Sequence, residues 1–273
     1  MSTGKIASPL AGPVVDTHCH MDVAFDDDFE LVDVTQAMSA ARAVNVTKVI
    51  QVGCDVASSR WAAQTALTHP DVWATVALHP NAAAHDTDLT NSLAEIALLA
   101  QLPQVRGIGE TGLDYYRTDK SQAQAQHESF RAHIDIAREV GKPVVIHDRD
   151  AHDDVINTLE THGAPDKVVF HCFSGDAQMA KICAQAGWYM SIPGVVTFKN
   201  AQQLRDAVLE IPDHLLLVET DSPFLTPAPN RGQVNASTNI PWTVRAICEV
   251  RGQSEQEICE LLFSNAARVF GPF

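Results

Sequence analysis

The chain of 273 residues has no long hydrophobic run, although 45% of its residues are hydrophobic. No segment stays apolar over the roughly 20 residues that a membrane-spanning helix needs, so we expect no interaction with a membrane. Residues 1–13 also lack the charged-then-apolar pattern of a secretory signal. We therefore expect a short N-terminal tail at 1–13, one globular domain at 14–273 and a cytoplasmic location.

Paired cysteines are missing as well. The six cysteines are scattered, at positions 19, 54, 172, 183, 248 and 259, and none belongs to a Cys-x-x-Cys motif. This spacing is typical of reduced, packed thiols in a cytosolic protein rather than of a disulfide framework. It also makes cysteine a less favoured metal ligand than histidine or a carboxylate.

Basic residues are few. The chain has 19 Lys and Arg residues against 34 Asp and Glu residues, which gives a formal net charge of −15. This balance excludes a broad basic surface that binds duplex DNA by releasing counterions. It does not exclude a phosphate substrate, because bound divalent cations reverse the local field inside a pocket.

Nucleotide-binding loops are not indicated, since no Gly-x-x-x-x-Gly-Lys-Ser/Thr motif occurs and the Gly-x-Gly-x-x-Gly spacing at 107–112 begins inside a strand-like run rather than after one. The sequence instead has eight short runs rich in Val and Ile, the pattern of strands buried on both faces of a parallel sheet. These runs are residues 13–17, 48–54, 72–78, 105–109, 143–146, 167–170, 188–192 and 215–218.

Amphipathic, helix-like stretches follow these runs. They are residues 29–44, 58–68, 89–101, 122–140, 152–162, 178–185 and 201–209, and two more, 242–250 and 255–269, end the chain. Ser254 and Glu257 predict a capping box for the last one. The alternation predicts an α/β fold, a single-domain (β/α)8 TIM barrel, with a doubly wound open sheet as the alternative. The proline-rich segment 222–241 follows the eighth run, where a barrel builds its active-site rim.

Polar residues recur where these runs end, which in a barrel is the edge that carries function. Two residues of one strand, His18 and His20, project to the same face. Each later residue has an ordinary explanation by itself, such as a core histidine, a helix cap or a turn. Their joint occurrence at one end of successive strands favours a metal centre for Zn²⁺, Mn²⁺ or Mg²⁺. The set is His18, His20, His79, Glu110, His147, His171, Glu219 and Asp221.

Five motifs in this order resemble the signatures of the TatD-type metal-dependent deoxyribonucleases, over essentially the whole chain. They are His-Cys-His at 18–20, Gly-Glu-Thr-Gly-Leu-Asp-Tyr at 109–115, His-Asp-Arg at 147–149, His-Cys-Phe-Ser-Gly at 171–175 and Glu-Thr-Asp-Ser-Pro at 219–223. The resemblance implies an amidohydrolase-like barrel with two divalent cations. It implies a 3′–5′ exonuclease whose substrate is single-stranded DNA or DNA ends.

Carried over residue by residue, the resemblance implies one metal bound by His18, His20, Glu110 and Asp221. The other metal would be bound by Glu110, His147 and His171, with Glu110 bridging. One stretch departs from the family, in which Arg-Gly-Lys-Arg-Asn-Glu-Pro is common where this chain has Arg-Gly-Gln-Val-Asn-Ala-Ser at 231–237. The departure leaves the metal ligands intact and bears on phosphate contacts at the rim.

The mechanism that we expect is attack of a two-metal-activated water on an ester bond, with Glu110 and Asp221 as the catalytic residues and Asp221 as the proton acceptor. Two side chains, His79 and Arg231, are candidates to neutralise a phosphate oxygen. Tyr115 is a candidate to stack on a base, with rim packing as the equal alternative.

Two rival hypotheses remain. The first is a two-metal hydrolase of a small phosphoester, amide or lactone, which the charge of −15 favours. The second is a non-catalytic scaffold stabilised by its metal, against which the complete ligand set argues.

Overall fold

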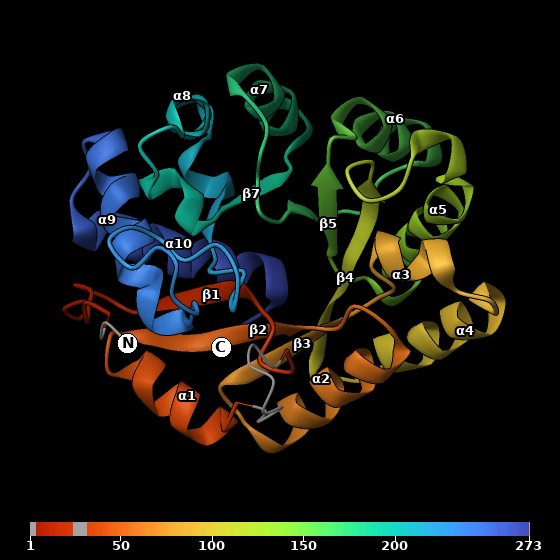
Figure 1. The fold of residues 1–273 in the computed structure, drawn as a ribbon, viewed down its shortest axis with the longest axis horizontal. Coiled ribbons are helices and arrows are strands. Elements are labelled where there is room, and N and C mark those ends of the chain that lie inside the picture. Colours follow the sequence, from red (N-terminus) through yellow and green to blue (C-terminus); the bar gives the residue numbers. More distant parts are fainter. Residues whose placement is uncertain (1–3, 24–31, 273) are drawn as a thin grey trace. The chain divides into compact units, whose positions relative to one another are not determined.

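The computed structural model describes residues 4–23 and 32–272. Eight strands alternate with helices along the chain, and the strands stand in the sheet in chain order from β1 to β8 (Figure 1). The pairs β3–β4, β4–β5, β5–β6 and β7–β8 are all parallel. This topology confirms the predicted (β/α)8 barrel. It excludes the doubly wound sheet, in which the strand order reverses at a switch point.

All eight strands lie on the predicted runs, within a few residues at each end. Five of them, β1, β3 and β6 to β8, are buried along their whole length, as expected for strands covered on both faces. The strands are β1 (Val14–Cys19), β2 (Val46–Val52), β3 (Val72–Val76), β4 (Val105–Asp114), β5 (Val144–Arg149), β6 (Val168–Phe170), β7 (Tyr189–Ile192) and β8 (Leu216–Val218).

The described residues form ten α-helices, nine of which were predicted. The unpredicted one, α3, is a single short helix that begins with a proline. The helices are α1 (Val34–Arg42), α2 (Val56–Thr68), α3 (Pro80–His85), α4 (Leu89–Ala100), α5 (Gln124–Val140), α6 (His152–His162), α7 (Ala177–Ala186), α8 (Gln202–Glu210), α9 (Ile240–Arg251) and α10 (Glu255–Phe270). Within the described ranges, no helix combines the length and the apolarity that crossing a bilayer requires.

Helix ends follow from their capping residues. The capping box predicted at α10 is present, with Ser254 and Glu257 each bonded to the other's backbone N–H. Residues 29–31 of the first predicted helix lie outside the described residues, and α1 begins at Val34, after Asp33, whose side chain accepts a hydrogen bond from the Gln36 N–H. A cap at Asp33 sets the start of a helix here.

Two compact units make up the chain, one of residues 1–50 and 175–273 and the other of residues 51–174. The first unit contains β1, β7 and β8, and α10 packs against both β1 and β8. Its residues 4–13 form neither helix nor strand, yet Ala7 and Leu10 are buried and the Leu10 N–H donates to the Val44 carbonyl. The segment predicted as a tail thus packs on the first unit.

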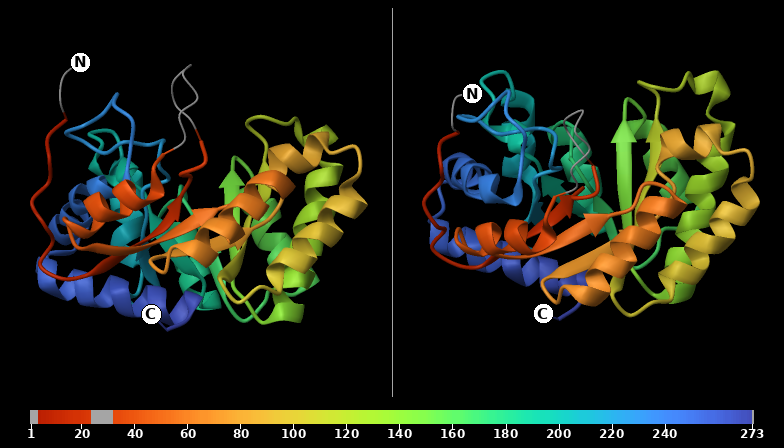
Figure 2. Two further views of the ribbon diagram at one scale, coloured as in Figure 1. Left: turned by 90° about the horizontal axis from the view of Figure 1, so that it is seen from below. Right: turned by 60° about the horizontal axis from the view of Figure 1, so that its bottom comes forward.

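The second unit contains β3 to β6, with α5 packed against β4 (Figure 2). The prediction differs most from the structure at β4, which runs to Asp114 rather than ending at 109. Gly112 explains the extension, because its φ is +140° and a Cβ there would lie 2.1 Å from the His147 carbonyl oxygen. Only glycine allows the two strands this approach. Glu110 therefore lies inside a strand.

Candidate metal centre

The first unit gathers three of the predicted metal ligands in one cluster, His18, His20 and Asp221. The Nε2 atoms of the two histidines lie 3.2 Å apart. The Asp221 Oδ1 atom is 3.4 Å from the His20 Nε2 atom and 3.9 Å from the His18 Nε2 atom. Both imidazoles are buried, with 0% of His18 and 6% of His20 exposed. We call these three residues the first cluster.

These spacings suit a metal ion. Ligand atoms about 2.1 Å from a tetrahedral Zn²⁺ lie about 3.4 Å from one another. The three distances in the first cluster, 3.2, 3.4 and 3.9 Å, bracket that value. A pair of imidazoles and a carboxylate is also the mixed nitrogen and oxygen set that transition metals favour. The residues present therefore fit a divalent cation.

Backbone pairing at the ends of β1 and β8 aims Asp221 at the histidines. The Asp221 N–H donates to the His18 carbonyl at 3.0 Å, and the His20 N–H donates to the Ser222 carbonyl at 2.7 Å. Asp221 has a φ of +54°. Aspartate tolerates this left-handed conformation better than most residues, and such a conformation outside glycine is frequent at functional sites.

The buried carboxylate of Asp16 stabilises the same junction of β1 and β8 through hydrogen bonds. Asp16 is 0% exposed, and its oxygens accept hydrogen bonds from the Thr220 N–H at 2.9 Å, the Thr220 hydroxyl at 2.6 Å and the Ser237 hydroxyl at 2.7 Å. Burial raises the pKa of Asp16 to about 6, although these hydrogen bonds oppose the shift. Asp16 was not predicted from the sequence. Its position two residues before His18, on the same strand face, was the available signal.

The second unit gathers Glu110 of β4, His147 of β5 and His171, which follows β6. The Glu110 Oε2 atom is 2.9 Å from the His147 Nδ1 atom and 2.9 Å from the His171 Nε2 atom. All three residues are among the groups whose ligand atoms lie within 4.8 Å of one another. Glu110 is 4% exposed and His171 6% exposed. We call these residues the second cluster.

Charge inside the second cluster favours metal binding. Burial alone would raise the pKa of Glu110, but the imidazoles of His171, His79 and His147 outweigh it and hold that pKa well below its usual range. Burial alone would also lower the pKa of His147, yet hydrogen bonds to Asp114 and Glu110 raise it. Glu110 is therefore ionised. A bound cation would take the place of the imidazole protons that now face this carboxylate.

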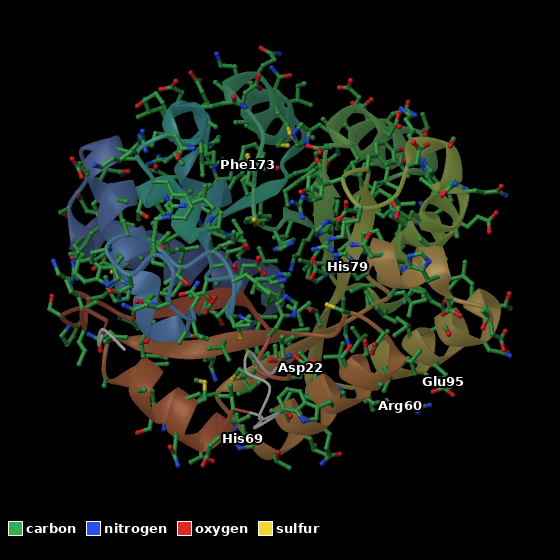
Figure 3. The ribbon with its side chains drawn as sticks, viewed as in Figure 1. Asp22, Arg60, His69, His79, Glu95 and Phe173 are labelled. Atoms are coloured by element: carbon green, nitrogen blue, oxygen red, sulfur yellow. The ribbon has the colours of Figure 1, made fainter. Side chains whose placement is uncertain are left out.

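His79 lies beside this cluster, with its Nε2 atom 3.8 Å from the Glu110 Oε2 atom (Figure 3). Its other ring nitrogen, Nδ1, accepts a hydrogen bond from the Asn81 N–H at 3.0 Å and so caps α3. Burial lowers the pKa of His79 to about 3, which keeps the ring neutral. A neutral ring whose Nδ1 accepts carries its proton on Nε2, so His79 presents a donor to the cluster.

Asp114 is a further residue of this site that was not predicted from the sequence. Its Oδ2 atom is 3.2 Å from the His147 Nε2 atom and accepts from the Asn81 side chain at 3.1 Å. Its Oδ1 atom accepts from the Arg117 N–H at 2.8 Å. Asp114 stands four residues after Glu110 on one strand, so alternation places both on the same face. That spacing would have identified it, had the strand been predicted to continue.

The predicted substrate-binding residues Arg231 and Tyr115 are placed outside the two clusters. The Arg231 guanidinium lies over the Phe198 ring, 4.0 Å from its centroid. The Tyr115 hydroxyl donates to the Asp154 carboxylate at 2.6 Å and lies 2.9 Å from the His127 Nε2 atom. Their roles toward a substrate stay predictions.

Comparison with known proteins identifies the family. Residues 15–271 match the family model described as TatD related DNase. The chain belongs to this family. A member from Mycobacterium tuberculosis, named the uncharacterized metal-dependent hydrolase TatD, is 42% identical over 262 residues, which are 94% of this chain and 98% of that protein. The Bacillus subtilis member YabD, also named a metal-dependent hydrolase, is 37% identical over 93% of this chain and 98% of its own.

A solved member of the TatD family has the same fold. The crystal structure of the Escherichia coli TatD homolog YjjV matches this chain with a TM-score of 0.86 and 27% identity, covering 94% of this chain and 97% of that one. The match confirms the (β/α)8 barrel. Together with the family model, it also confirms the resemblance drawn from the five motifs.

Proposed function

We propose that the chain is a two-metal hydrolase of phosphodiester bonds and that its substrate is single-stranded DNA, degraded from the 3′ end. The observation that supports this proposal is that the first and second clusters each hold imidazole and carboxylate atoms at metal-ligand spacing, within a family named for its DNases. The names of the M. tuberculosis and B. subtilis relatives support the broader description, a metal-dependent hydrolase. A cytoplasmic location stays a prediction.

The proposed ligands follow the two clusters. His18, His20 and Asp221 would hold one divalent cation, His147 and His171 would hold the other, and Glu110 is the residue that the family motif implies for both. When bound, two such cations supply a water of lowered pKa and a Lewis acid for the phosphoryl oxygen. Mg²⁺, Mn²⁺ and Zn²⁺ each suit this chemistry, and the imidazoles favour the transition metals.

Two side chains complete the proposed mechanism. Asp221, beside His18 and His20, accepts the proton of the attacking water. The His79 Nε2–H donates a hydrogen bond to a non-bridging phosphate oxygen. Because the ring is neutral, His79 acts as a hydrogen-bond donor and transfers no proton during the reaction. Arg231 is exposed and is the proposed rim contact for a neighbouring phosphate.

The test is metal content measured together with hydrolysis. Metal-free protein is supplied with Mg²⁺, Mn²⁺ or Zn²⁺ and given single-stranded DNA labelled at its 5′ end. We expect single-nucleotide shortening that a chelator abolishes. If the DNA is hydrolysed with none of the three metals, the proposal is wrong.

Two histidine variants distinguish a catalytic ion from a structural one. We expect His147→Ala to bind one ion fewer and to lose at least about 100-fold in turnover while keeping its fold. The control His162→Ala, on the outer helix α6, should retain the metals and the activity. If His147→Ala unfolds the protein but the folded fraction is fully active, the ion is structural and the scaffold hypothesis gains.

The net charge of −15 favours the second candidate, hydrolysis of a small phosphoester, amide or lactone. Both candidates predict turnover of a generic phosphodiester by the metal-loaded protein. They differ in competition, because unlabelled single-stranded DNA should inhibit that turnover only if DNA occupies the same site.

A further inference from the structure

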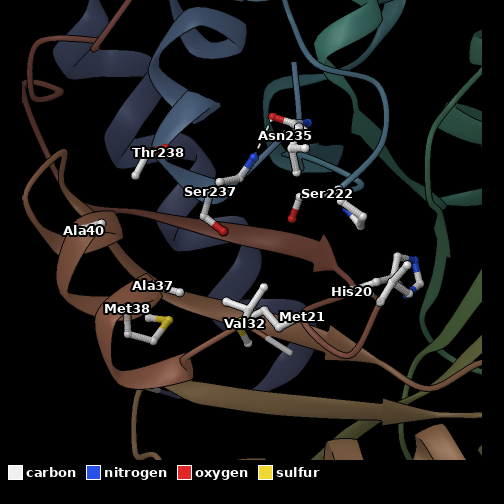
Figure 4. A pocket seen from close by; sticks show the side chains of 14 residues that line it. His20, Met21, Val32, Ala37, Met38, Ala40, Ser222, Asn235, Ser237 and Thr238 are labelled. Carbon is white, nitrogen blue, oxygen red and sulfur yellow. Dashed lines mark hydrogen bonds between the residues drawn. The ribbon is translucent and has the colours of Figure 1, made fainter. Parts of the chain in front are cut away.

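A cavity of about 520 Å³ lies beside the first cluster, entirely within the first unit (Figure 4). It is bounded by α1, by the residues that follow β1 and by the loop after β8. Its volume falls within the range of about 300–1,000 Å³ typical of small-molecule sites. The larger apolar side chains of its wall are Met21, Val23, Val32, Met38, Pro223 and Val234.

Most polar groups of the wall are already engaged within the protein. The Asn235 amide donates to the Thr220 and Phe224 carbonyls, and its oxygen accepts from the Ala236 N–H. The Ser237 hydroxyl donates to Asp16. Among the fourteen described residues that line the cavity, His20 is the single titratable one. The wall formed by the described residues is therefore largely apolar and uncharged, which disfavours a phosphate.

His20 connects the cavity to the metal centre, because it lines the cavity and also belongs to the first cluster. Ser222, the neighbour of Asp221, lines it too. A group that enters the cavity therefore lies next to His20, which is one of the proposed metal ligands. Figure 4 shows His20 at one end of the cavity and Ala40 and Thr238 toward the other, with Met21 and Val32 between them.

We propose that this cavity binds the nucleobase of the nucleotide whose phosphate is attacked. The identity of this occupant rests on the proposed nuclease function. A base is uncharged and planar, and methionine sulfur, present here in Met21 and Met38, makes favourable contacts with such rings. Three of the residues at which segment 231–237 departs from the family pattern, Val234, Ala236 and Ser237, line the cavity. The residues that differ from the family pattern are therefore among those that would contact the base.

Two variants alter the cavity without touching a proposed ligand. Ala37→Phe fills it from α1, and Val234→Asp, at a position 51% exposed, places a charge on its wall. The matched control is Ser39→Phe, which adds the same ring to α1 at an exposed position outside the cavity. Circular dichroism and metal content establish that each variant is folded and loaded.

The first readout compares DNA that ends in a normal nucleotide with DNA that ends in an abasic tetrahydrofuran residue. With Mn²⁺ bound, we expect the wild type and Ser39→Phe to prefer the normal end by about tenfold in kcat/KM. In Ala37→Phe and Val234→Asp the preference should fall toward one, mainly through loss of rate on the normal end.

The second readout needs no turnover. Saturation-transfer NMR with 2′-deoxyadenosine should show ring-proton contacts with the holoprotein and with Ser39→Phe, and none with Ala37→Phe. If DNA is cleaved but abasic ends react equally and the nucleoside signal is the same in all variants, the cavity proposal is wrong and the nuclease function stands. If DNA is not cleaved but the nucleoside signal depends on Ala37, the cavity is supported and the nuclease function fails.

Discussion

His147 lies between two carboxylates, with its Nε2 atom 3.2 Å from the Asp114 Oδ2 atom and its Nδ1 atom facing Glu110. Without a metal both ring nitrogens can donate, in agreement with the raised pKa of His147. His147 would hold a cation at the second cluster through Nδ1 in place of the proton there, and the hydrogen bond to Asp114 would keep the proton on Nε2. Asp114 would thus fix the tautomer in which Nδ1 is free to bind the proposed cation, a common arrangement around metal-binding histidines.

Removing the charge of Asp114 should weaken metal binding at the second cluster. In Asp114→Asn a single amide oxygen must serve the three donors from His147, Asn81 and Arg117 that the carboxylate now accepts. We expect the affinity of one bound ion, the one at the second cluster, to fall about 10- to 100-fold, measured by competition with a chromophoric chelator. Asp153→Asn, at an exposed position on α6, is the control and should leave both affinities unchanged. Equal affinities in the two variants would refute the positioning role.

The junction of β1 and β8 should show a characteristic pH dependence. The pKa of Asp16, raised by burial to about 6, exceeds its unfolded value of 3.8, so the folded state holds the proton more tightly. The stability from this group is therefore fully present below about pH 4 and is lost as the pH rises through 6. Thr220→Val removes a hydroxyl that stabilises the carboxylate, and should raise this pKa further.

We accordingly expect Thr220→Val to cost about 1–3 kcal/mol of unfolding free energy at pH 8 and clearly less at pH 5, where Asp16 is mostly protonated. Urea unfolding of the metal-free proteins at the two pH values measures this. Thr161→Val, which removes an exposed helical hydroxyl, should change stability by less than about 0.5 kcal/mol at either pH. An equal loss at pH 5 and pH 8 would show that Thr220 does not act through the Asp16 charge.

Periodicity located the strands, while the grouping of His18, His20 and Asp221 came from the family resemblance together with barrel topology. A period of two puts His18 and His20 on one face, and barrel topology places the residue after β8 at the same end as the residue after β1. The bonds from Asp16 to Thr220 were not predictable in the same way, because they join residues 204 positions apart and depend on side-chain packing.

Local backbone geometry limited the prediction at β4 and α3. The predicted strand ended at 109, yet Gly112 is the residue that lets β4 continue beside β5. The helix α3 has six residues, too few for a periodic signal, and it is stabilised by its His79 cap. As a result, the contacts of Asp114 with His147 and of Asn81 with Asp114 were not predicted.

The buried histidine His133, which belongs to neither cluster, provides a test of stability. Its Nε2 atom accepts from the Leu78 N–H at 3.0 Å, and its Nδ1 atom lies 2.7 Å from the Ser129 carbonyl oxygen. Burial lowers its pKa to about 4 from 6.5, so the unfolded state binds the proton first as the pH falls. This contribution to stability is present above pH 6.5 and is lost as the pH falls toward 4.

Between pH 7.5 and pH 5, His133 alone should reduce the unfolding free energy by about 2 kcal/mol. His133→Gln, which keeps an acceptor and a donor but does not titrate, should show a correspondingly flatter profile in the metal-free protein. Guanidinium unfolding at several pH values gives both profiles. Identical slopes for the variant and the wild type would mean that His133 is not held neutral in the fold.

Gly112 should be the least replaceable glycine of the second unit's sheet. In Gly112→Ala the new Cβ would lie 2.1 Å from the His147 carbonyl oxygen, at a φ of +140°, so β4 and β5 must separate where they carry Glu110 and His147. We expect a loss of more than about 3 kcal/mol in stability, beyond most single substitutions, and weaker metal binding at the second cluster. Gly187→Ala is the matched control, because Gly187 has a φ of +74° and no atom lies within 4 Å of the place that a methyl group would take, so only the conformational cost of about 1–2 kcal/mol applies. Thermal unfolding and chelator competition distinguish the two, and equal effects would show that close pairing of β4 with β5 is not what Gly112 provides.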